Sequence, residues 1–174
     1  MDFQKRLKKL KLLIFDVDGI LTDNTVLMGE NGREYKRFNL ADGMGFYLAR
    51  LAGIKIALIS GRYSPATDSR AKELGLGDVY QGYLNKVKAI EELTAKYDLS
   101  PEEICYMGDD IIDLQAMETS GFCATVPHGA EEIRSIADYI TEKEGGNGAA
   151  RELINLILKA KGIKATELWG ANNA

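Results

Sequence analysis

The stretch LLIFDVDGILTD, residues 12–23, decides the fold and poses the chemical question of this chain. An apolar run ends there on Asp16 and Asp18, two acids one residue apart, and Gly19 follows them. A short apolar run of this kind is typical of a buried strand, and the glycine marks the turn where the strand leaves the core. Two carboxylates so close together repel each other, so the stretch predicts a cation at the end of a buried strand.

Outward from this stretch, short apolar runs alternate with segments of helical period. The later apolar runs are IKIALIS, DVYQG, ICYMG, FCATV and DYIT. Between two of them, NKVKAIEELTAKYD carries apolar side chains on one helical face, at Val87, Ile90, Leu93 and Tyr97. This alternation predicts an α/β fold in which a parallel sheet is covered by helices on both faces. Two further helix starts are predicted at Ser64-Pro65 and Ser100-Pro101, where a hydroxyl residue precedes a proline.

One interval, residues 25–39, breaks the alternation. Its segments TVLM and REYKRFN are typical of two strands, and the glycine-bounded turn GENG joins them, which predicts a β-hairpin inserted after the first strand. A length of 174 residues suits a single domain, which we expect to span residues 1–174. The domain should begin with a short amphipathic helix and end in a loosely composed tail, about residues 163–174.

Composition narrows the class of protein. The net charge of −4 gives no reason to expect nucleic-acid binding, and no run of about 18 uncharged apolar residues could span a bilayer. Cys105 and Cys123 lie in apolar segments without metal-type spacing, so we interpret them as buried thiols of a cytoplasmic protein; a disulfide is the weaker alternative. His128, the only histidine, follows a proline and is expected in a loop without a catalytic role.

Polar residues close the apolar runs: Asp16, Asp18, Ser60, Lys86, Asp109 and Asp110. In an open parallel sheet, the carboxyl ends of the strands form one rim, and ligands bind there. Three or more carboxylates at that rim would repel one another by several kcal/mol unless a cation lay among them. Oxygen ligands suit Mg²⁺, which prefers one or two carboxylates together with a phosphate oxygen and water. The sequence therefore predicts a magnesium site at this rim.

Taken singly, each of these motifs also fits a structural interpretation. The acids of DVDG fit a turn with a side-chain hydrogen bond, and GDD is a common turn composition. Ser60-Gly61-Arg62 fits a strand-to-helix turn whose N–H groups could bind an anion, and Lys86 fits a solvated lysine at a helix start. The order of the four motifs, and their shared position at strand ends, favour the chemical interpretation.

The segments LLIFDVDG, ALISGR, NK before VKAI, and YMGDDIID resemble the four motifs of the haloacid dehalogenase superfamily of phosphohydrolases. Over about residues 8–162, the segments FNLADGMG, GRYSPATDSRAKELG, VYQGYLNK and EGGNGAARE closely resemble the 3-deoxy-D-manno-octulosonate (KDO) 8-phosphate phosphatases. The superfamily implies a Rossmann-like fold, dependence on Mg²⁺ and an aspartyl-phosphate intermediate. The closer family implies a short hairpin in place of a lid domain, and a homotetramer.

The resemblance and the chemistry together suggest roles. Asp16 is the expected nucleophile, and Asp18 should protonate the leaving sugar oxygen and then accept a proton from water. Ser60 and Lys86 should bind phosphate oxygens and stabilise charge in the transition state. The expected metal ligands are the carboxylates of Asp16 and Asp109 and, by family resemblance, the peptide carbonyl of Asp18. Supporting positions are expected for Asp110 and for Asp113, the latter paired with Lys86.

The residues named so far contact the phosphate end of a substrate, and among them Asp18 and Lys86 are also expected to bind the substrate. Specificity for the rest of the substrate must therefore come from other residues. Candidates that match the family pattern are a loop of Asn39, Leu40, Ala41, Asp42 and Gly43, then Tyr47 on the following helix, and Arg62 and Arg70. Arg70 should lie two turns beyond Arg62 on one helix face and bind a sugar-acid carboxylate; a surface arginine is the alternative. Tyr47 departs from the basic residue that the family pattern leads us to expect there.

Two features bear on assembly. Without a lid, the site would need a neighbouring subunit to exclude water, and the hairpin offers apolar side chains for that contact at Val26, Met28, Tyr35 and Phe38. Gly145, Gly146 and Gly148 could form an anion nest or simply turn the chain, and by family analogy they could reach a neighbour's site.

The leading hypothesis is an Mg²⁺-dependent phosphatase acting on KDO 8-phosphate. A phosphatase for a nine-carbon relative, 2-keto-3-deoxynononate 9-phosphate, is the nearest alternative. Two alternatives come from other classes: a receiver domain, whose phosphoacceptor would follow the third strand, and a non-catalytic phosphatase-like oligomerisation module. The run DVYQG offers no aspartate at its end, and the full set of acids argues against a non-catalytic module.

Overall fold

The computed structural model describes residues 2–173, so Ala174 of the expected tail lies outside the described residues. Six parallel strands form the main sheet in the order β5-β4-β1-β6-β7-β8. Their bounds are β1 Leu12–Phe15, β4 Lys55–Ser60, β5 Asp78–Gln81, β6 Ile104–Met107, β7 Phe122–Thr125 and β8 Tyr139–Ile140. The chain runs from β1 outward through β4 to β5, and then returns to add β6 on the other side. The boundary between β1 and β6 is therefore the topological switch point, where α/β sheets bind ligands.

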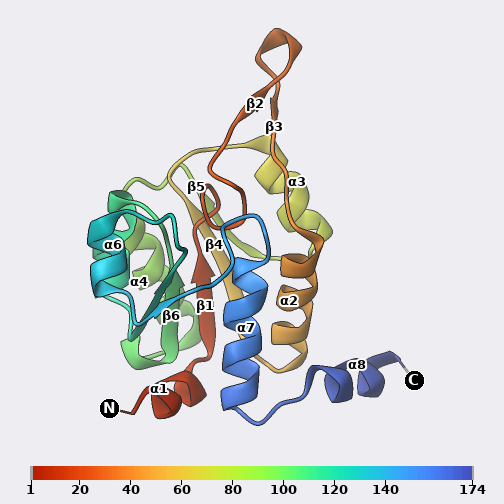
Figure 1. Cartoon of the computed structure of the whole chain (residues 1–174), viewed down its shortest axis with the longest axis vertical. Helices are drawn as coiled ribbons and strands as arrows, with labels where there is room; N and C mark the ends of the chain where they lie inside the picture. The colour runs from red at the N-terminus through yellow and green to blue at the C-terminus, as the bar shows by residue number, and fades with distance from the viewer. Residues whose placement is uncertain (1, 174) are drawn as a thin grey trace.

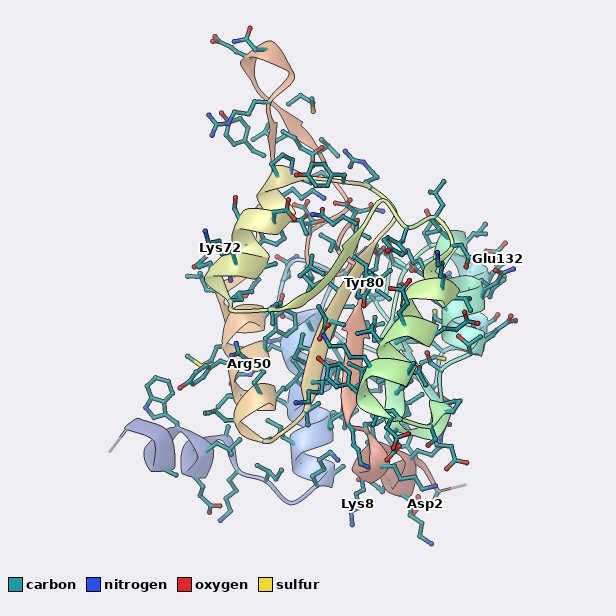
Figure 2. The ribbon with its side chains drawn as sticks, turned by 180° about the vertical axis from the view of Figure 1, so that it is seen from behind. Asp2, Lys8, Arg50, Lys72, Tyr80 and Glu132 are labelled. Carbon is teal, nitrogen blue, oxygen red and sulfur yellow. The ribbon has the colours of Figure 1, made fainter. Side chains whose placement is uncertain are left out.

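Helices cover both faces of this sheet, as the α/β pattern predicts (Figure 1). One face carries α1 Phe3–Lys9, α2 Leu40–Leu51, α3 Pro65–Glu73 and α7 Ala149–Ala160, and the other carries α4 Lys86–Tyr97, α5 Leu114–Glu118 and α6 Glu131–Ile136. Strand β1 is buried along its whole length because Leu13 and Phe15 contact the first layer while Leu12 and Ile14 contact the second. Figure 2 shows the sheet from behind, with Tyr80 of the edge strand β5.

The predicted hairpin is present but has shorter strands than expected. It projects beyond the end of the sheet (Figure 1), and its strands are β2 Leu27–Met28 and β3 Glu34–Tyr35, paired antiparallel. The short 3-10 turn Glu30–Gly32 joins them. Of the apolar side chains expected on its surface, Val26, Met28 and Tyr35 are exposed. The expectation for Phe38 is wrong, because this ring is partly buried against the core.

Two predictions about helices need correction. Ser100-Pro101 begins only the 3-10 turn Pro101–Glu103, since strand β6 starts immediately afterwards at Ile104. The loosely composed tail contains a helix that the sequence pattern did not predict: α8, Ala165–Asn173, lies beside α2, and the Trp169 ring contacts Tyr47 at 6.1 Å between centroids. The expected amphipathic helix at the start is α1, whose Leu7 is buried. Between residues 2 and 173, every helix is too short or too polar to cross a membrane.

Candidate active site

A pocket of about 260 Å³ opens at the switch point, where the chain leaves β1, β4 and β6. Neighbouring strands bring these exits together, since Phe15 at the end of β1 is paired with Met107 at the end of β6 and with Leu58, two residues before the end of β4. The pocket is lined by Asp16, Asp18, Asn24, Val26, Ser60, Gly61, Arg62, Leu84, Lys86, Asp109, Asp110 and Ile112. The structure therefore brings together all six of the strand-end polar residues that the sequence indicates.

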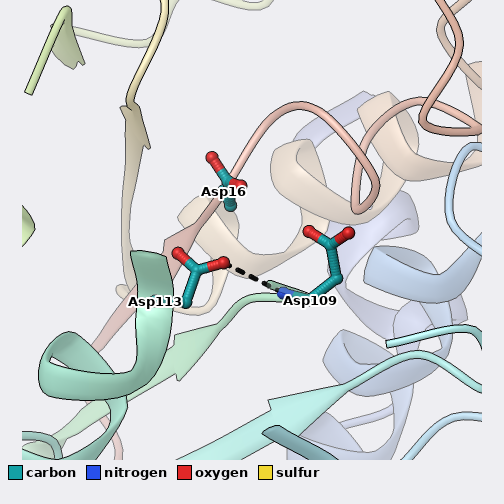
Figure 3. A group of neighbouring side chains, drawn as sticks. All are labelled: Asp16, Asp109 and Asp113. Carbon is teal, nitrogen blue, oxygen red and sulfur yellow. Dashed lines mark hydrogen bonds between the residues drawn. The ribbon is translucent and has the colours of Figure 1, made fainter. Parts of the chain in front are cut away.

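Three buried carboxylates lie close together, and two of them, Asp16 and Asp109, line this pocket (Figure 3). Asp16 follows β1, Asp109 follows β6, and Asp113 ends the 3-10 turn Ile111–Asp113 that leads into α5. One carboxylate oxygen from each lies within 4.8 Å of the other two. This spacing suits a divalent cation with oxygen ligands.

Asp113 is fully engaged by the protein itself. Its Oδ1 accepts hydrogen bonds from Lys86 Nζ at 2.6 Å and from the Tyr106 hydroxyl at 2.7 Å. Its Oδ2 accepts from the backbone N–H groups of Asp109 at 3.0 Å, drawn in Figure 3, and of Asp110 at 3.2 Å. The expected pairing of Asp113 with Lys86 is confirmed. With four donors in place, Asp113 orients the loop that carries Asp109.

Asp109 is the acid with an unfilled oxygen. Its Oδ1 is buried and has no hydrogen-bond partner among the described residues. Burial first, and then the charges of Asp113 and Asp110, raise the pKa of Asp109 to about 7. A buried carboxylate oxygen without a partner is costly. A bound Mg²⁺ would be coordinated by this oxygen and would favour the ionised form of Asp109. Asp16 and Asp109 therefore fit the metal-ligand role expected for them.

Asp16 is held in place by a buried lysine. The Nζ atom of Lys86 lies 2.9 Å from Oδ1 of Asp16, and both side chains are almost wholly enclosed. Burial raises the pKa of Asp16 well above its ordinary value, and the charge of Asp113 adds to this, while Lys86 opposes both. Burial also acts to lower the pKa of Lys86, but the charges of Asp16 and Asp113 outweigh it, so that the pKa is raised. Lys86 is therefore a cation bound between two carboxylates rather than a solvated lysine.

Glycines let the backbone approach these acids. Gly19 has φ +90°, and a Cβ atom there would lie 2.0 Å from Oδ2 of Asp109. Only glycine fits both the conformation and the space. On the outer side of the same loop, a Cβ atom on Gly145 would lie 1.8 Å from the carbonyl oxygen of Gly19, and the Gly146 N–H donates to Ile20 at 3.0 Å. The glycine-rich segment thus packs against the loop that carries the acids of its own chain.

Ser60 and Arg62 leave the end of β4 toward the pocket. Ser60 is buried, and its Oγ accepts from the Arg62 N–H at 3.3 Å. Arg62 lies in the turn before α3, which begins at Pro65, so the expectation that Arg62 and Arg70 share a helix face is wrong. The proline fixes the start of the helix and leaves Arg62 free to bend over the rim, where its Nη1 lies 3.6 Å from Oδ2 of Asp18.

The other expected specificity residues lie outside this pocket. The expected loop is the start of helix α2: Asn39 caps it by accepting from the Ala41 N–H at 2.8 Å, and residues 40–43 form its first turn. Asp42 is buried and accepts from the Arg151 N–H at 2.8 Å. Arg70 donates to the Asn39 carbonyl at 3.3 Å and pairs with Glu73 at 2.9 Å. Their part in substrate binding stays a prediction.

Several site features gave no sequence signal. Lys36 and Glu34 of the hairpin reach the rim and contact Asp18 and Arg62, although nothing in REYKR indicates where these charges point. The apolar side chains Val26, Leu84 and Ile112 line the mouth of the pocket. As expected, His128 lies in an exposed loop, where its ring contacts Glu144.

Comparisons with known proteins agree with this architecture. A family model described as haloacid dehalogenase-like hydrolase matches residues 71–153. The KDO 8-phosphate phosphatase KdsC of Escherichia coli (strain K12) is 40% identical over 161 residues, which cover 92% of this chain and 86% of that protein. A crystal structure of the Moraxella catarrhalis KDO 8-phosphate phosphatase, in complex with magnesium ion, phosphate ion and KDO, is 41% identical with a TM-score of 0.91. The match covers 98% of this chain and 97% of that one.

A second crystal structure, of the KDO 8-phosphate phosphatase from Yersinia pestis, is 38% identical with a TM-score of 0.89 and covers 91% of this chain and 86% of that chain. The parallel sheet, the inserted hairpin and the strand-end acids define a haloacid dehalogenase-like hydrolase. Identity of about 40% over more than nine-tenths of the chain is specific to one group within that class. The chain belongs to the 3-deoxy-D-manno-octulosonate 8-phosphate phosphatase family.

Proposed function

We propose that this chain hydrolyses KDO 8-phosphate to KDO and inorganic phosphate, with Mg²⁺ as its cofactor. The observation that carries the proposal is the agreement between two findings. First, Asp16 and Asp109 lie together in a pocket, and Oδ1 of Asp109 is buried there without a hydrogen-bond partner among the described residues. Second, a relative with 41% identity and the same fold is described with magnesium, phosphate and KDO bound. The relative names the metal and the sugar acid, and the acids of this chain provide a place where the metal could bind.

The proposed reaction has two steps, and both Asp16 and Asp18 take part in each. A carboxylate oxygen of Asp16 attacks phosphorus, forming an aspartyl phosphate while the bond from phosphorus to the sugar oxygen breaks. Asp18 donates a proton to that oxygen as it leaves, and then accepts a proton from the water that attacks the aspartyl phosphate. Phosphate departs and the Asp16 carboxylate is restored, so protons balance over the two steps.

The metal would be held by the Asp16 and Asp109 carboxylates and by the peptide carbonyl of Asp18. When bound, Mg²⁺ supplies positive charge that neutralises the phosphoryl oxygens and permits attack by an anion. The protein adds hydrogen-bond donors of its own to the same pocket. Lys86 and Ser60 would bind phosphoryl oxygens, and Lys86 also fixes the orientation of the nucleophile through its contact with Oδ1 of Asp16.

Recognition of the sugar acid is proposed to involve Arg62, whose guanidinium lies at the rim of the pocket with its side chain half exposed. A guanidinium binds a carboxylate through two parallel hydrogen bonds, which suits the acid group of the substrate. Arg70 and Tyr47 lie outside the pocket of their own chain, so any contact between them and a substrate would require a rearrangement or a site shared with a second copy.

A homotetramer is proposed as the working assembly. The hairpin exposes Val26, Leu27, Met28 and Tyr35, four large apolar side chains on a projecting element. An exposed apolar cluster of this kind is typical of a protein interface, and a neighbour seated there would cover the mouth of the pocket at Val26. Light scattering on a sized sample tests this assembly, and a fully active monomer would exclude it.

The cytoplasm is proposed as the location. Cys105 and Cys123 are both buried free thiols, which is typical of proteins in a reducing compartment.

Turnover with a panel of sugar phosphates tests the substrate assignment. We expect KDO 8-phosphate to give the highest kcat/KM with Mg²⁺, and EDTA to abolish turnover reversibly. A higher value for 2-keto-3-deoxynononate 9-phosphate would leave the chemistry intact and change the substrate. A protein that binds Mg²⁺ but hydrolyses no phosphate ester would contradict the proposed function.

A further inference from the structure

Lys36 of the hairpin forms a hydrogen-bonded ion pair with Asp18, the acid two residues after the proposed nucleophile Asp16. Lys36 lies just after β3, and its Nζ atom is 2.5 Å from Oδ1 of Asp18. The Lys36 side chain is fully enclosed, with an exposed fraction of 0%. Enclosing an ammonium group is costly unless it is paired and hydrogen-bonded, so this contact is a built feature of the rim and not a chance surface pair.

Two more charges complete the contact. Glu34, two residues before Lys36, is on the same side of the strand, and its Oε2 accepts from Nη2 of Arg62 at 2.5 Å. Its Oε1 lies 3.7 Å from Lys36 Nζ, while Nη1 of Arg62 lies 3.6 Å from Oδ2 of Asp18. Two cations and two anions thus alternate around a ring that clips the hairpin to the ends of β1 and β4.

The two carboxylate oxygens of Asp18 have different surroundings in this ring of charges. Oδ1 is taken by Lys36, whereas Oδ2 is buried and has no hydrogen-bond partner between residues 2 and 173. Holding a carboxyl group by one oxygen fixes its rotamer and leaves the other oxygen to exchange a proton. General acid catalysis requires this kind of fixed geometry, because the donor must lie within hydrogen-bond reach of the leaving oxygen.

We propose that Lys36 is a positioning residue for Asp18, and that it makes seating of the hairpin a condition for proton transfer. The inference rests on the proposed phosphatase activity and adds to it a residue outside the four motifs. In this account Lys36 contacts neither phosphate nor metal. It acts by holding Oδ1 of Asp18 while Glu34 holds Arg62 and keeps the clip closed.

A purely structural role for Lys36 makes a different prediction from a positioning role. Proton donation matters for a sugar-phosphate ester, whose alkoxide leaving group needs a proton, and hardly at all for p-nitrophenyl phosphate, whose phenolate leaves unprotonated. A positioning role therefore slows formation of the aspartyl phosphate only from the sugar ester. Loss of the hairpin or of the fold slows it from both esters.

The test compares Lys36→Met with Lys36→Arg and with a matched control, Lys72→Met, which removes an exposed lysine from α3 (Figure 2). We expect Lys36→Met to lower kcat for KDO 8-phosphate about 100-fold, the lower end of what a general acid contributes. The same variant should change the rate of the pre-steady-state burst of p-nitrophenol by less than about threefold. Its KM for KDO 8-phosphate should change little, and Lys36→Arg should recover part of kcat for that substrate. Lys72→Met should match the wild type.

The double variant separates failure of this inference from failure of the proposed function. In an Asp18→Asn background, Lys36→Met should add less than about threefold, because a residue that acts through Asp18 has nothing left to position. Equal losses on both esters, additive losses in the double variant, or wild-type kcat in Lys36→Met would overturn the inference. A wild type that hydrolyses neither ester would instead overturn the proposed function.

Discussion

The Nζ atom of Lys86 lies 2.9 Å from Oδ1 of Asp16, and the same atom lies 2.6 Å from Oδ1 of Asp113. One buried ammonium group thus holds both Asp16, the proposed nucleophile, and Asp113, the acid that orients the loop carrying Asp109. The sum of these three charges is negative, and Asp109 adds a further buried carboxylate. A divalent cation would stabilise a site of this kind, and in the proposed function the phosphate binds between that cation and the lysine.

Replacing Lys86 by Met should lower kcat about 10²- to 10³-fold, because a preorganised cation is lost from the transition state and Asp16 loses its partner. The effect on KM should be smaller. Steady-state kinetics with saturating Mg²⁺ measures both. Lys88→Met, an exposed lysine on the same helix, serves as the control. A variant with normal kcat and raised KM would mean that Lys86 only binds the substrate.

Asp113→Asn should weaken Mg²⁺ binding about 10- to 100-fold, the usual effect of removing an outer-shell partner. The neutral amide keeps the volume but loses the charge that Lys86 and two N–H groups of the Asp109 loop require. Titration calorimetry with Mg²⁺ measures the change without reference to turnover. Tyr106→Phe removes only one of the four hydrogen bonds and should cost about 1.5 to 3 kcal/mol of stability, the usual range for a hydrogen bond to a charged group. Unchanged affinity in Asp113→Asn would show that Asp109 is oriented by other contacts.

Gly19→Ala should destabilise the protein and weaken Mg²⁺ binding together. The new Cβ atom would lie 2.0 Å from Oδ2 of Asp109, on a residue with φ +90°, so the clash falls on a proposed metal ligand. Gly77→Ala is the matched control, since its φ is not positive and its Cβ would meet nothing within 4 Å. Thermal unfolding with and without Mg²⁺ compares the two. If Gly19→Ala behaved like Gly77→Ala, the close approach of the loop to Asp109 would be refuted.

Without metal, the contribution of Asp109 to stability should fall as pH rises through the acid range. The pKa of Asp109 is raised in the folded protein to about 7 from an ordinary 3.8, chiefly by burial. The folded state therefore binds more protons than the unfolded state between these values, and the contribution of Asp109 to stability, complete below about pH 4, is lost as pH rises toward 7. Urea unfolding in EDTA at several pH values measures this slope.

Two comparisons isolate the contribution of Asp109 from those of other acids. Asp109→Asn should flatten the slope because the amide does not titrate, and Mg²⁺ should stabilise the wild type more at pH 8 than at pH 5 because protons compete for the carboxylates. A slope that is the same in Asp109→Asn would mean that other buried groups cause the pH dependence.

The sequence was sufficient for the parts of this molecule whose signals are local. The run LLIF, buried on both sides, and the helical face around Ile90 and Leu93 predict the parallel sheet and its covering layers. Because all parallel strands end at one rim, placing Asp16 and Asp109 at strand ends was enough to predict that they meet. The pairing of Lys86 with Asp113 followed from the same rim.

What could not be predicted depends on contacts between distant segments. Asp42 looked like part of a substrate loop, yet its carboxylate accepts from the Arg151 N–H, 109 positions away, which no local pattern reveals. The direction of the hairpin decides that Lys36 reaches Asp18, and sequence periodicity is silent on direction for strands of two residues. The tail from Ala165 has only a weak apolar pattern, so the sequence alone does not predict a helix there. In the structure the tail is helical and packs against α2.

Trapping the phosphorylated enzyme tests the central claim most directly. Wild-type protein mixed with KDO [³²P]8-phosphate and Mg²⁺, then quenched in acid within one turnover, should carry label in the peptide that contains Asp16, and Asp16→Asn should carry none. Label on any other residue, or equal turnover by Asp16→Asn, would contradict the account.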